Sequence, residues 1–122
     1  MEVLMLNQAD VRRLLDRDRL LDALTGAFQA LSDGRTDVPA RVAANTDAGF
    51  LAAMPGYGRG MGLATKLVSV FPGNHDHGLP SHQALICVFD PDSGSPLAVM
   101  DGNYVTAIRT AGCAAVSTRL LA

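Results

Sequence analysis

The sequence lacks the features that mark several specialised classes of protein. It contains no tryptophan, only 5% of its residues are aromatic, and no apolar run approaches the length of a membrane span. Its net charge is -2 and its basic residues form no long cluster, which argues against a nucleic-acid-binding surface. The N-terminus has neither the basic start nor the long apolar stretch of a signal peptide. We therefore expect no nucleic-acid or membrane partner, and a cytoplasmic location.

Cysteines and metal-binding patterns are equally scarce. The two cysteines, Cys87 and Cys113, lie far apart in apolar segments, which favours two buried thiols in a reducing cytoplasm over a disulfide. No cysteine–histidine spacing suits zinc. The segment His75-Asp76-His77 is flanked by glycines, and we interpret it as a solvated loop. The sequence predicts no metal site.

Residues 56–62 include four glycines, but their order does not suit a phosphate-binding loop. No Gly-Lys-Ser/Thr ends the segment, and it does not follow the strand, tight turn and helix of a dinucleotide-binding fingerprint. We interpret it as a flexible connection between strands. The chain therefore shows no nucleotide-binding motif.

The 122 residues, 48% hydrophobic and 18% charged, fit one globular domain over residues 1–122. Apolar spacing predicts helices from Asn7 to about Asp16 and from about Asp18 to Ser32, with Gly34 as a stop. The expected strands are Val3–Leu6, Val38–Ala44, Phe50–Met54, Leu63–Phe71, His82–Phe89 and Pro96–Met100. A helix rich in small residues follows from Asp101. Short turns between strands predict an α+β fold with an antiparallel sheet of about six strands.

The helical pattern continues through residues 117–122 without a glycine or proline to close it. This pattern indicates a boundary set by a gene or a cloned fragment rather than a natural domain end.

Three positively charged residues occupy unusual places. Arg41 and Lys66 each interrupt an apolar predicted strand, and Arg109 lies in the small-residue helix. Each charge can belong to a solvated outer face, although the neighbours of Arg109 suit this interpretation less well. A cation held among apolar residues needs a counter-anion, and few acids lie in these strands. Arginine can grip a carboxylate through two parallel hydrogen bonds. The residues alone therefore predict a pocket for a small anionic ligand.

Polar side chains also open the predicted strand that begins near residue 82. His82 has a pKa range suited to a general acid or base, and it has an alternative role as a hydrogen-bonding residue at a strand end. Because polar groups cluster there, we expect Ser81 and His82 to contact a ligand.

Seven blocks of the sequence, in this order and spacing, resemble the ornithine cyclodeaminase/mu-crystallin family. They are Phe50–Pro55, Thr65–Val68, Phe71–Asn74, Leu79–Ala84, Phe89–Gly94, Leu97–Asn103 and Thr106–Ala111. The resemblance covers nearly the whole chain and is most specific after residue 50. It implies an NAD(P)-dependent enzyme that acts at the carbon–nitrogen bond of small amino acids or cyclic imines. It also implies a homodimer whose substrate-binding and dimerisation domain is followed by a Rossmann domain.

The resemblance also assigns roles to individual residues. Arg41, Lys66 and Arg109 match the cations that hold the substrate carboxylate, with Lys66 as the catalytic candidate. Ser81, His82, Arg109 and Thr110 match positions near the NAD or NADP cofactor. The Rossmann fingerprint and the family's acidic catalytic residue are both expected beyond Ala122. The chain is therefore incomplete relative to the family, and we expect it to be inactive alone.

Several functions remain open within this resemblance. The motifs look most like ketimine reductases and alanine dehydrogenases. Ornithine cyclodeaminases, which convert ornithine to proline and ammonia, usually carry an acid just before the Met-Pro pair, where this chain has Ala53. Other hypotheses are a truncated, non-catalytic module that dimerises or binds a ligand, and a binding protein of the crystallin type that stores a ligand.

Overall fold

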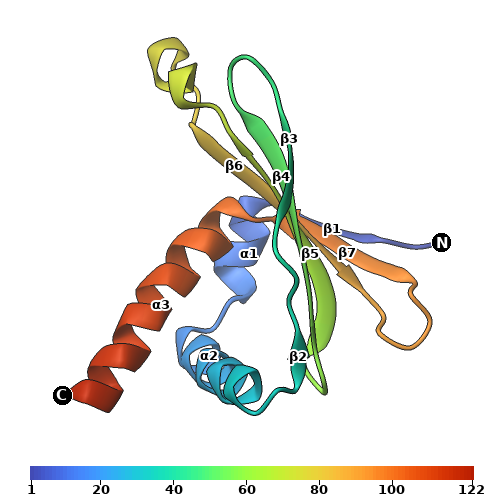
Figure 1. Ribbon diagram of the computed structural model, residues 1–122, viewed down its shortest axis with the longest axis vertical. Helices are drawn as coiled ribbons and strands as arrows, with labels where there is room; N and C mark the ends of the chain where they lie inside the picture. The colour runs from blue at the N-terminus through green and yellow to red at the C-terminus, as the bar shows by residue number, and fades with distance from the viewer.

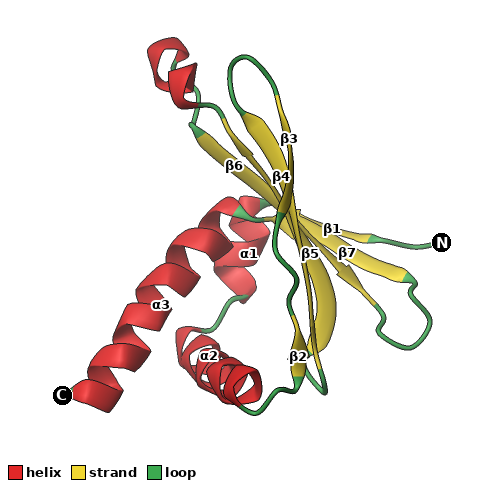
Figure 2. Ribbon diagram, in the orientation of Figure 1, coloured by secondary structure: helices red, strands yellow, loops and turns green.

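The computed structural model describes residues 1–122 as a twisted sheet with its helices on one side (Figures 1 and 2). In chain order the elements are β1 (Leu4–Leu6), α1 (Gln8–Leu14), α2 (Arg17–Ser32), β2 (Thr36–Asp37), β3 (Val42–Asn45), β4 (Phe50–Gly58), β5 (Gly62–Val70), the 3-10 helix η1 (Pro72–His77), β6 (His82–Phe89), β7 (Pro96–Asp101) and α3 (Asn103–Leu121). None of the helices combines the length and the apolar character needed to cross a bilayer.

The sheet has seven strands in the order β1-β7-β6-β5-β4-β2, and β3 also pairs with β4. The α+β class is confirmed. The sheet has one strand more than expected because β2 lies before the predicted strand Val38–Ala44, of which only the part from Val42 joins the sheet, as β3. Pro39 lies in the irregular segment between the two strands. The sheet is also not wholly antiparallel. Strand β1 pairs in parallel with β7, an arrangement that needs a long crossover, here most of the chain.

Strand β4 does not end at Pro55-Gly56, as the sequence predicted, but runs on to Gly58. On one side it pairs continuously with β5, where Pro55 lies opposite Thr65. On its other side, β3 pairs with β4 as far as Ala53 and β2 pairs with it from Tyr57. Residues 54–56 therefore face no strand on that side. Proline is tolerated there because no neighbouring strand requires its missing N–H.

The predicted cap at Asn7 and the predicted stop at Gly34 are confirmed, whereas the first helix ends at Leu14, two residues before the expected Asp16. The side chain of Asn7 accepts a hydrogen bond from the backbone N–H of Asp10 at 2.9 Å, and the Asp10 carboxylate reciprocates. Asp16 caps α2 in the same way, and Gly34 follows that helix with the positive φ of 70° that favours glycine.

The two faces of the sheet differ in what covers them. One register row, Met54–Lys66–Ile86–Met100, lies on the face toward α3, and the next row, Ala53–Leu67–Leu85–Asp101, points to the opposite face. On the helix side a small core forms around Ala52, Val68 and Ala84. No helix packs on the other face, and large apolar side chains are exposed there. They are Val42 (67% exposed), Leu51 (53%), Leu85 (49%) and Leu97 (46%), which we call the outer apolar face.

Candidate functional site

A pocket of about 790 Å³ lies between the sheet and α3, beside the stretch of β4 that has no neighbouring strand on one side. The break between β2 and β3 forms one wall, because residues 38–41 cross there without joining the sheet. Strands β4, β5 and β6 form the floor, and the first two turns of α3 form the opposite wall. The irregular backbone around Pro39 and Pro55 thus makes room for a ligand.

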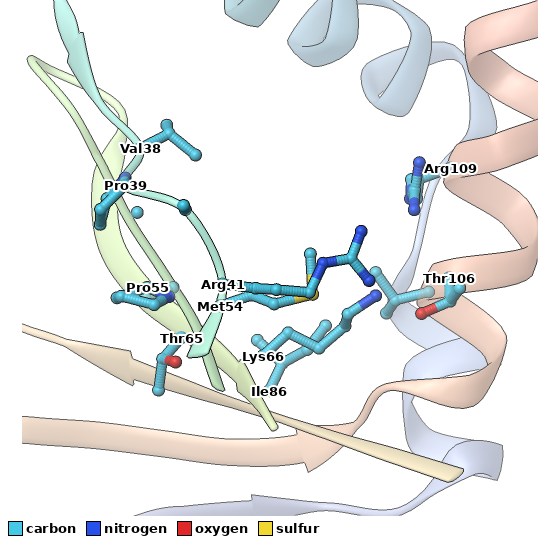
Figure 3. A pocket seen from close by; sticks show the side chains of 14 residues that line it. Val38, Pro39, Arg41, Met54, Pro55, Thr65, Lys66, Ile86, Thr106 and Arg109 are labelled. Carbon is cyan, nitrogen blue, oxygen red and sulfur yellow. The ribbon is translucent and has the colours of Figure 1, made fainter. Parts of the chain in front are cut away.

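Arg41, Lys66 and Arg109 all line this pocket. Arg41 ends the irregular segment just before β3, Lys66 lies in the middle of β5, and Arg109 lies two turns into α3. Figure 3 shows Arg41 and Lys66 extending from the sheet toward the helix that carries Thr106 and Arg109. Arg41 and Arg109 are exposed and Lys66 is half-buried, so all three remain within reach of a ligand from solvent. The fold therefore brings together three cations that are far apart in the sequence.

No carboxylate balances these charges. The pocket has no aspartate or glutamate in its lining, and the three salt bridges of the structure involve other residues. Burial, followed by the nearby charges of Arg109 and then Arg41, lowers the pKa of Lys66 below its ordinary value of 10.5. Since these charges repel one another, a bound anion is the group that would relieve them. The arrangement is therefore suited to holding a small carboxylate.

The rest of the pocket is largely apolar, and sequence reasoning did not identify these residues. Met54 and Ile86 flank Lys66 in the same register row, Val105 faces them from α3, and Thr106 adds a hydroxyl. Once Lys66 was identified, its neighbours on adjacent strands could have been expected to line the same pocket, because residues opposite one another in register share a face of the sheet. The register itself could not be read from a single sequence. A ligand with a carboxylate and an uncharged remainder matches this lining.

The remaining predicted site residues lie outside the pocket lining. Ser81 and His82 are half-buried at the start of β6, and His82 pairs with Val70 at the far end of β5 from the glycine turn. Thr110 follows Arg109 on α3, is exposed, and donates its hydroxyl to the Thr106 carbonyl at 2.7 Å. The structure thus groups only the three cations, and the roles of Ser81, His82 and Thr110 near a cofactor stay predictions.

Ala53, at the place where ornithine cyclodeaminases usually carry an acid, does not line the pocket. It pairs with Val42 and Leu67 and lines a shallow apolar groove on the opposite face of the sheet. Its neighbour Ala52 points to the same face of the sheet as the pocket, and it is fully buried. The pocket therefore has no acid that could pair with a second amino group of a substrate.

Both cysteines are free thiols. Cys87 lies in β6 and Cys113 in α3, and each is half-buried rather than fully buried as expected.

Comparisons with known proteins agree on one family. The sequence profile of the ornithine cyclodeaminase/mu-crystallin family matches residues 1–122. The chain is 44% identical to ketimine reductase mu-crystallin of Mus musculus over 104 residues, which cover 83% of the chain and 33% of that protein. Among solved structures, it superposes with a TM-score of 0.86 and 36% identity on Thermococcus litoralis Δ1-pyrroline-2-carboxylate reductase in complex with NADH and L-proline, covering 92% of the chain and 36% of the reductase. An archaeal alanine dehydrogenase dimer with bound NAD gives a TM-score of 0.87 at 38% identity, over 93% of the chain and 35% of the dehydrogenase. The chain thus spans about a third of the length of each of these relatives.

Replacing Lys66 with methionine should raise the free energy of unfolding at neutral pH, because it removes a charge that the folded state disfavours. In the unfolded chain, Lys66 regains its ordinary pKa, so the unfolded state binds more protons between the lowered pKa and 10.5. Wild-type stability should therefore recover as the pH rises through that window, and the advantage of Lys66→Met should shrink. Urea denaturation followed by circular dichroism between pH 7 and pH 10 measures this difference.

Lys66→Arg is the matched control, since it keeps the positive charge and should gain no such advantage. An advantage of Lys66→Met that stays constant across this pH range would contradict the repulsion proposed for the three cations.

Proposed function

Because the chain belongs to the ornithine cyclodeaminase/mu-crystallin family, we propose that it is the substrate-binding part of an NAD(P)-dependent amino-acid or imine oxidoreductase. The observation that carries this proposal is the convergence of Arg41, Lys66 and Arg109 on a pocket without an acid. The relatives named above include enzymes of this kind, but the chain covers only about a third of each. The activity, the substrate and the partner of the whole protein are therefore proposed here from these residues and from the family.

In this proposal the two arginines bind the substrate carboxylate and so fix the position of the α-carbon. Arg41 approaches from the sheet side and Arg109 from α3, which places a carboxylate between two guanidinium groups. Holding the reacting carbon in one orientation supplies a large part of the rate of such a reaction. Thr106 lies one helical turn before Arg109 and offers a hydroxyl to the same ligand.

Lys66 is the proposed catalytic residue of this chain. Its lowered pKa makes its ammonium group a better proton donor than an ordinary lysine near neutral pH. From the floor of the pocket it can contact the carboxylate, or it can polarise the substrate nitrogen or a water molecule. Both roles require the protonated form, which a bound carboxylate favours.

The cofactor proposed for the intact protein is NAD or NADP, which supplies or accepts the hydride when bound. In residues 1–122 the pocket could receive the nicotinamide end of this cofactor, but no segment is suited to its phosphates. Two strands lead directly into an α-helix. The junction at Asn7 has no glycine, and the junction at Gly102 has a single glycine that is closely packed against Ala84, so neither offers a glycine-rich turn for phosphates. Arg109 is accessible at the pocket and suits a group that reaches it, and Ser81, His82 and Thr110 remain proposed contacts outside its lining.

The lining favours a ketimine reductase or alanine dehydrogenase type of substrate over ornithine. Met54, Ile86 and Val105 surround the cations with apolar groups, which suit a cyclic or short aliphatic remainder. The distal ammonium of ornithine would meet three positive charges and no carboxylate in this part of the site.

Arg109→Ala should weaken binding of L-proline to the chain by roughly 10- to 100-fold, because a charged hydrogen bond is worth about 1.5–3 kcal/mol. Isothermal titration calorimetry measures the affinity. Arg119→Ala is the matched control, since Arg119 is an exposed arginine on the same helix but does not line the pocket. Equal affinities for the wild-type chain and Arg109→Ala would refute the proposed carboxylate site.

Turnover is tested in a protein that joins this chain to a nucleotide-binding domain of the same family. NADH and NADPH oxidation should be detectable with Δ1-pyrroline-2-carboxylate or with pyruvate and ammonia, and should exceed NAD(P)-dependent turnover of ornithine. Arg109→Ala and Lys66→Met should each lower kcat/KM by at least about 10-fold. Binding of these carboxylates without any turnover would favour a ligand-storage role instead.

The proposed partner of the chain is a second copy, seated on the outer apolar face. Val42, Leu51, Leu85 and Leu97 come from four strands and are 46–67% exposed, and no helix of the chain covers them. A monomer rarely exposes a contiguous apolar surface of this kind. A two-fold axis would place this face against its own copy, and the alanine dehydrogenase compared above is a dimer.

Leu85→Lys should convert a dimer into a monomer in size-exclusion chromatography with light scattering, because it would bury a charge at the centre of the interface. Leu31→Lys is the matched control, since Leu31 is similarly exposed (58%) but lies on α2. A wild-type chain that stays monomeric at high micromolar concentration would contradict the dimer.

A further inference from the structure

The junction between β7 and α3 is tied directly to strand β6. The backbone N–H of Gly102 donates to the carbonyl of Ala84 at 2.8 Å. The backbone N–H of Ala84 in turn donates to the side-chain oxygen Oδ1 of Asn103, also at 2.8 Å, in a half-buried setting. Both backbone polar groups of one β6 residue are therefore used to fix the first residues of α3.

Close packing reinforces these hydrogen bonds. Gly102 is buried, and a Cβ atom at its position would lie 2.8 Å from the Cβ of Ala84 and 2.9 Å from its carbonyl carbon. Atoms this close leave no space for any side chain at residue 102. Ala84 itself is only 7% exposed, so the contact forms within the small core. The start of α3 is thus held against β6 by contact as well as by hydrogen bonds.

This junction determines where Arg109 lies. Thr106 and Arg109 are neighbours one turn apart on α3 and both line the pocket, and Asn103 lies one turn before Thr106. The side chain of Arg109 makes no salt bridge or hydrogen bond within the chain, so its position depends on the course of the helix. With a rise of about 1.5 Å per residue, Arg109 lies roughly 9 Å along the helix from Asn103. A tilt of about 10° at the junction would move it by roughly 1.5 Å.

Other contacts of α3 do not replace this one. Farther along the helix, Gly112 packs against Leu24 of α2, and near its start the ring of Tyr104 lies 4.4 Å from the Arg12 guanidinium of α1. These contacts join α3 to other helices. The backbone N–H of Tyr104 also donates to the Asp101 carboxylate of β7 at 3.0 Å. The link through Ala84 joins α3 to β6, the strand that carries Ile86 in the pocket floor two residues later.

We propose that Asn103 is a positioning residue for the carboxylate site, one that acts by fixing α3 to β6 so that Arg109 faces Lys66 and Arg41. The proposal rests on the proposed function, because it assumes that Arg109 binds the carboxylate. Asn103 does not line the pocket and has no direct contact with the ligand in this role. Its contribution is geometric, since a displacement of about 1 Å is enough to weaken the effect of an oriented group substantially.

The test is a double-mutant cycle of Asn103→Ala and Arg109→Ala, with L-proline as the probe and calorimetric affinity as the readout. Asn103→Ala should lower the affinity by about 10-fold, equivalent to about 1.4 kcal/mol. In the Arg109→Ala background the same substitution should have almost no further effect, because residues that act through one group are not additive. Asn103→Asp, which keeps the accepting oxygen, should restore most of the affinity.

Two further variants separate positioning from general stability. Asn7→Ala removes the helix cap of α1, so it should lower the melting temperature without lowering the affinity for L-proline. Asn103→Gln keeps the amide but displaces its oxygen by one methylene, so it should reproduce the affinity loss even if Asn103→Ala fails to fold.

Equal losses from Asn103→Ala in both backgrounds, or wild-type affinity of folded Asn103→Gln, would overturn this inference while leaving the carboxylate site intact. If Arg109→Ala alone leaves the affinity unchanged, the proposed function fails, and the role of Asn103 fails with it.

Discussion

The main constraint on this structure is the repulsion among three positive charges that share one pocket. Arg41, Lys66 and Arg109 converge without an internal counter-anion, and burial, followed by the charges of Arg109 and Arg41, lowers the pKa of Lys66. Like charges at close range in a partly desolvated site raise the free energy of the folded state. The scaffold must therefore supply enough stability elsewhere to keep them together. The same repulsion prepares the site for an anion, since a bound carboxylate turns an unfavourable arrangement into a favourable one.

Each of the three cations belongs to a different element of the fold, and each element is held in place by different contacts. Lys66 is held between two neighbours in the centre of the sheet, and Arg41 follows a segment that leaves the sheet beside Pro39. Arg109 is carried by a helix that begins at a packed glycine and is fixed through Asn103. Because the anchors differ, the backbone positions of the three residues are fixed by separate sets of contacts.

Much of this could be predicted from the sequence. Strand β6, the helix cap at Asn7 and the stop at Gly34 follow from local chemistry, and the structure confirms them. The three cations were identified because charges are unusual in apolar strands. Features that depend on distant partners were missed. The parallel pairing of β1 with β7, the continuation of β4 through Pro55, and the link from Asn103 to Ala84 all require knowledge of which strand lies alongside. The face to which each strand residue points, such as Ala53, could not be predicted either, because a shift of one residue reverses the face.

The alternation that separates the two faces of the sheet also restricts how such a chain can vary in length. Lys66 and Leu67 are neighbours in β5, yet one belongs to the pocket and the other to the opposite face. Inserting or deleting a single residue within β4, β5 or β6 would exchange the two sets of side chains beyond that point. In β5, such a change before Lys66 would move its ammonium group from the pocket to the outer apolar face. Tolerated length changes should therefore fall in the connections around residues 46–49, 59–61 and 90–95, where the chain reverses direction between strands.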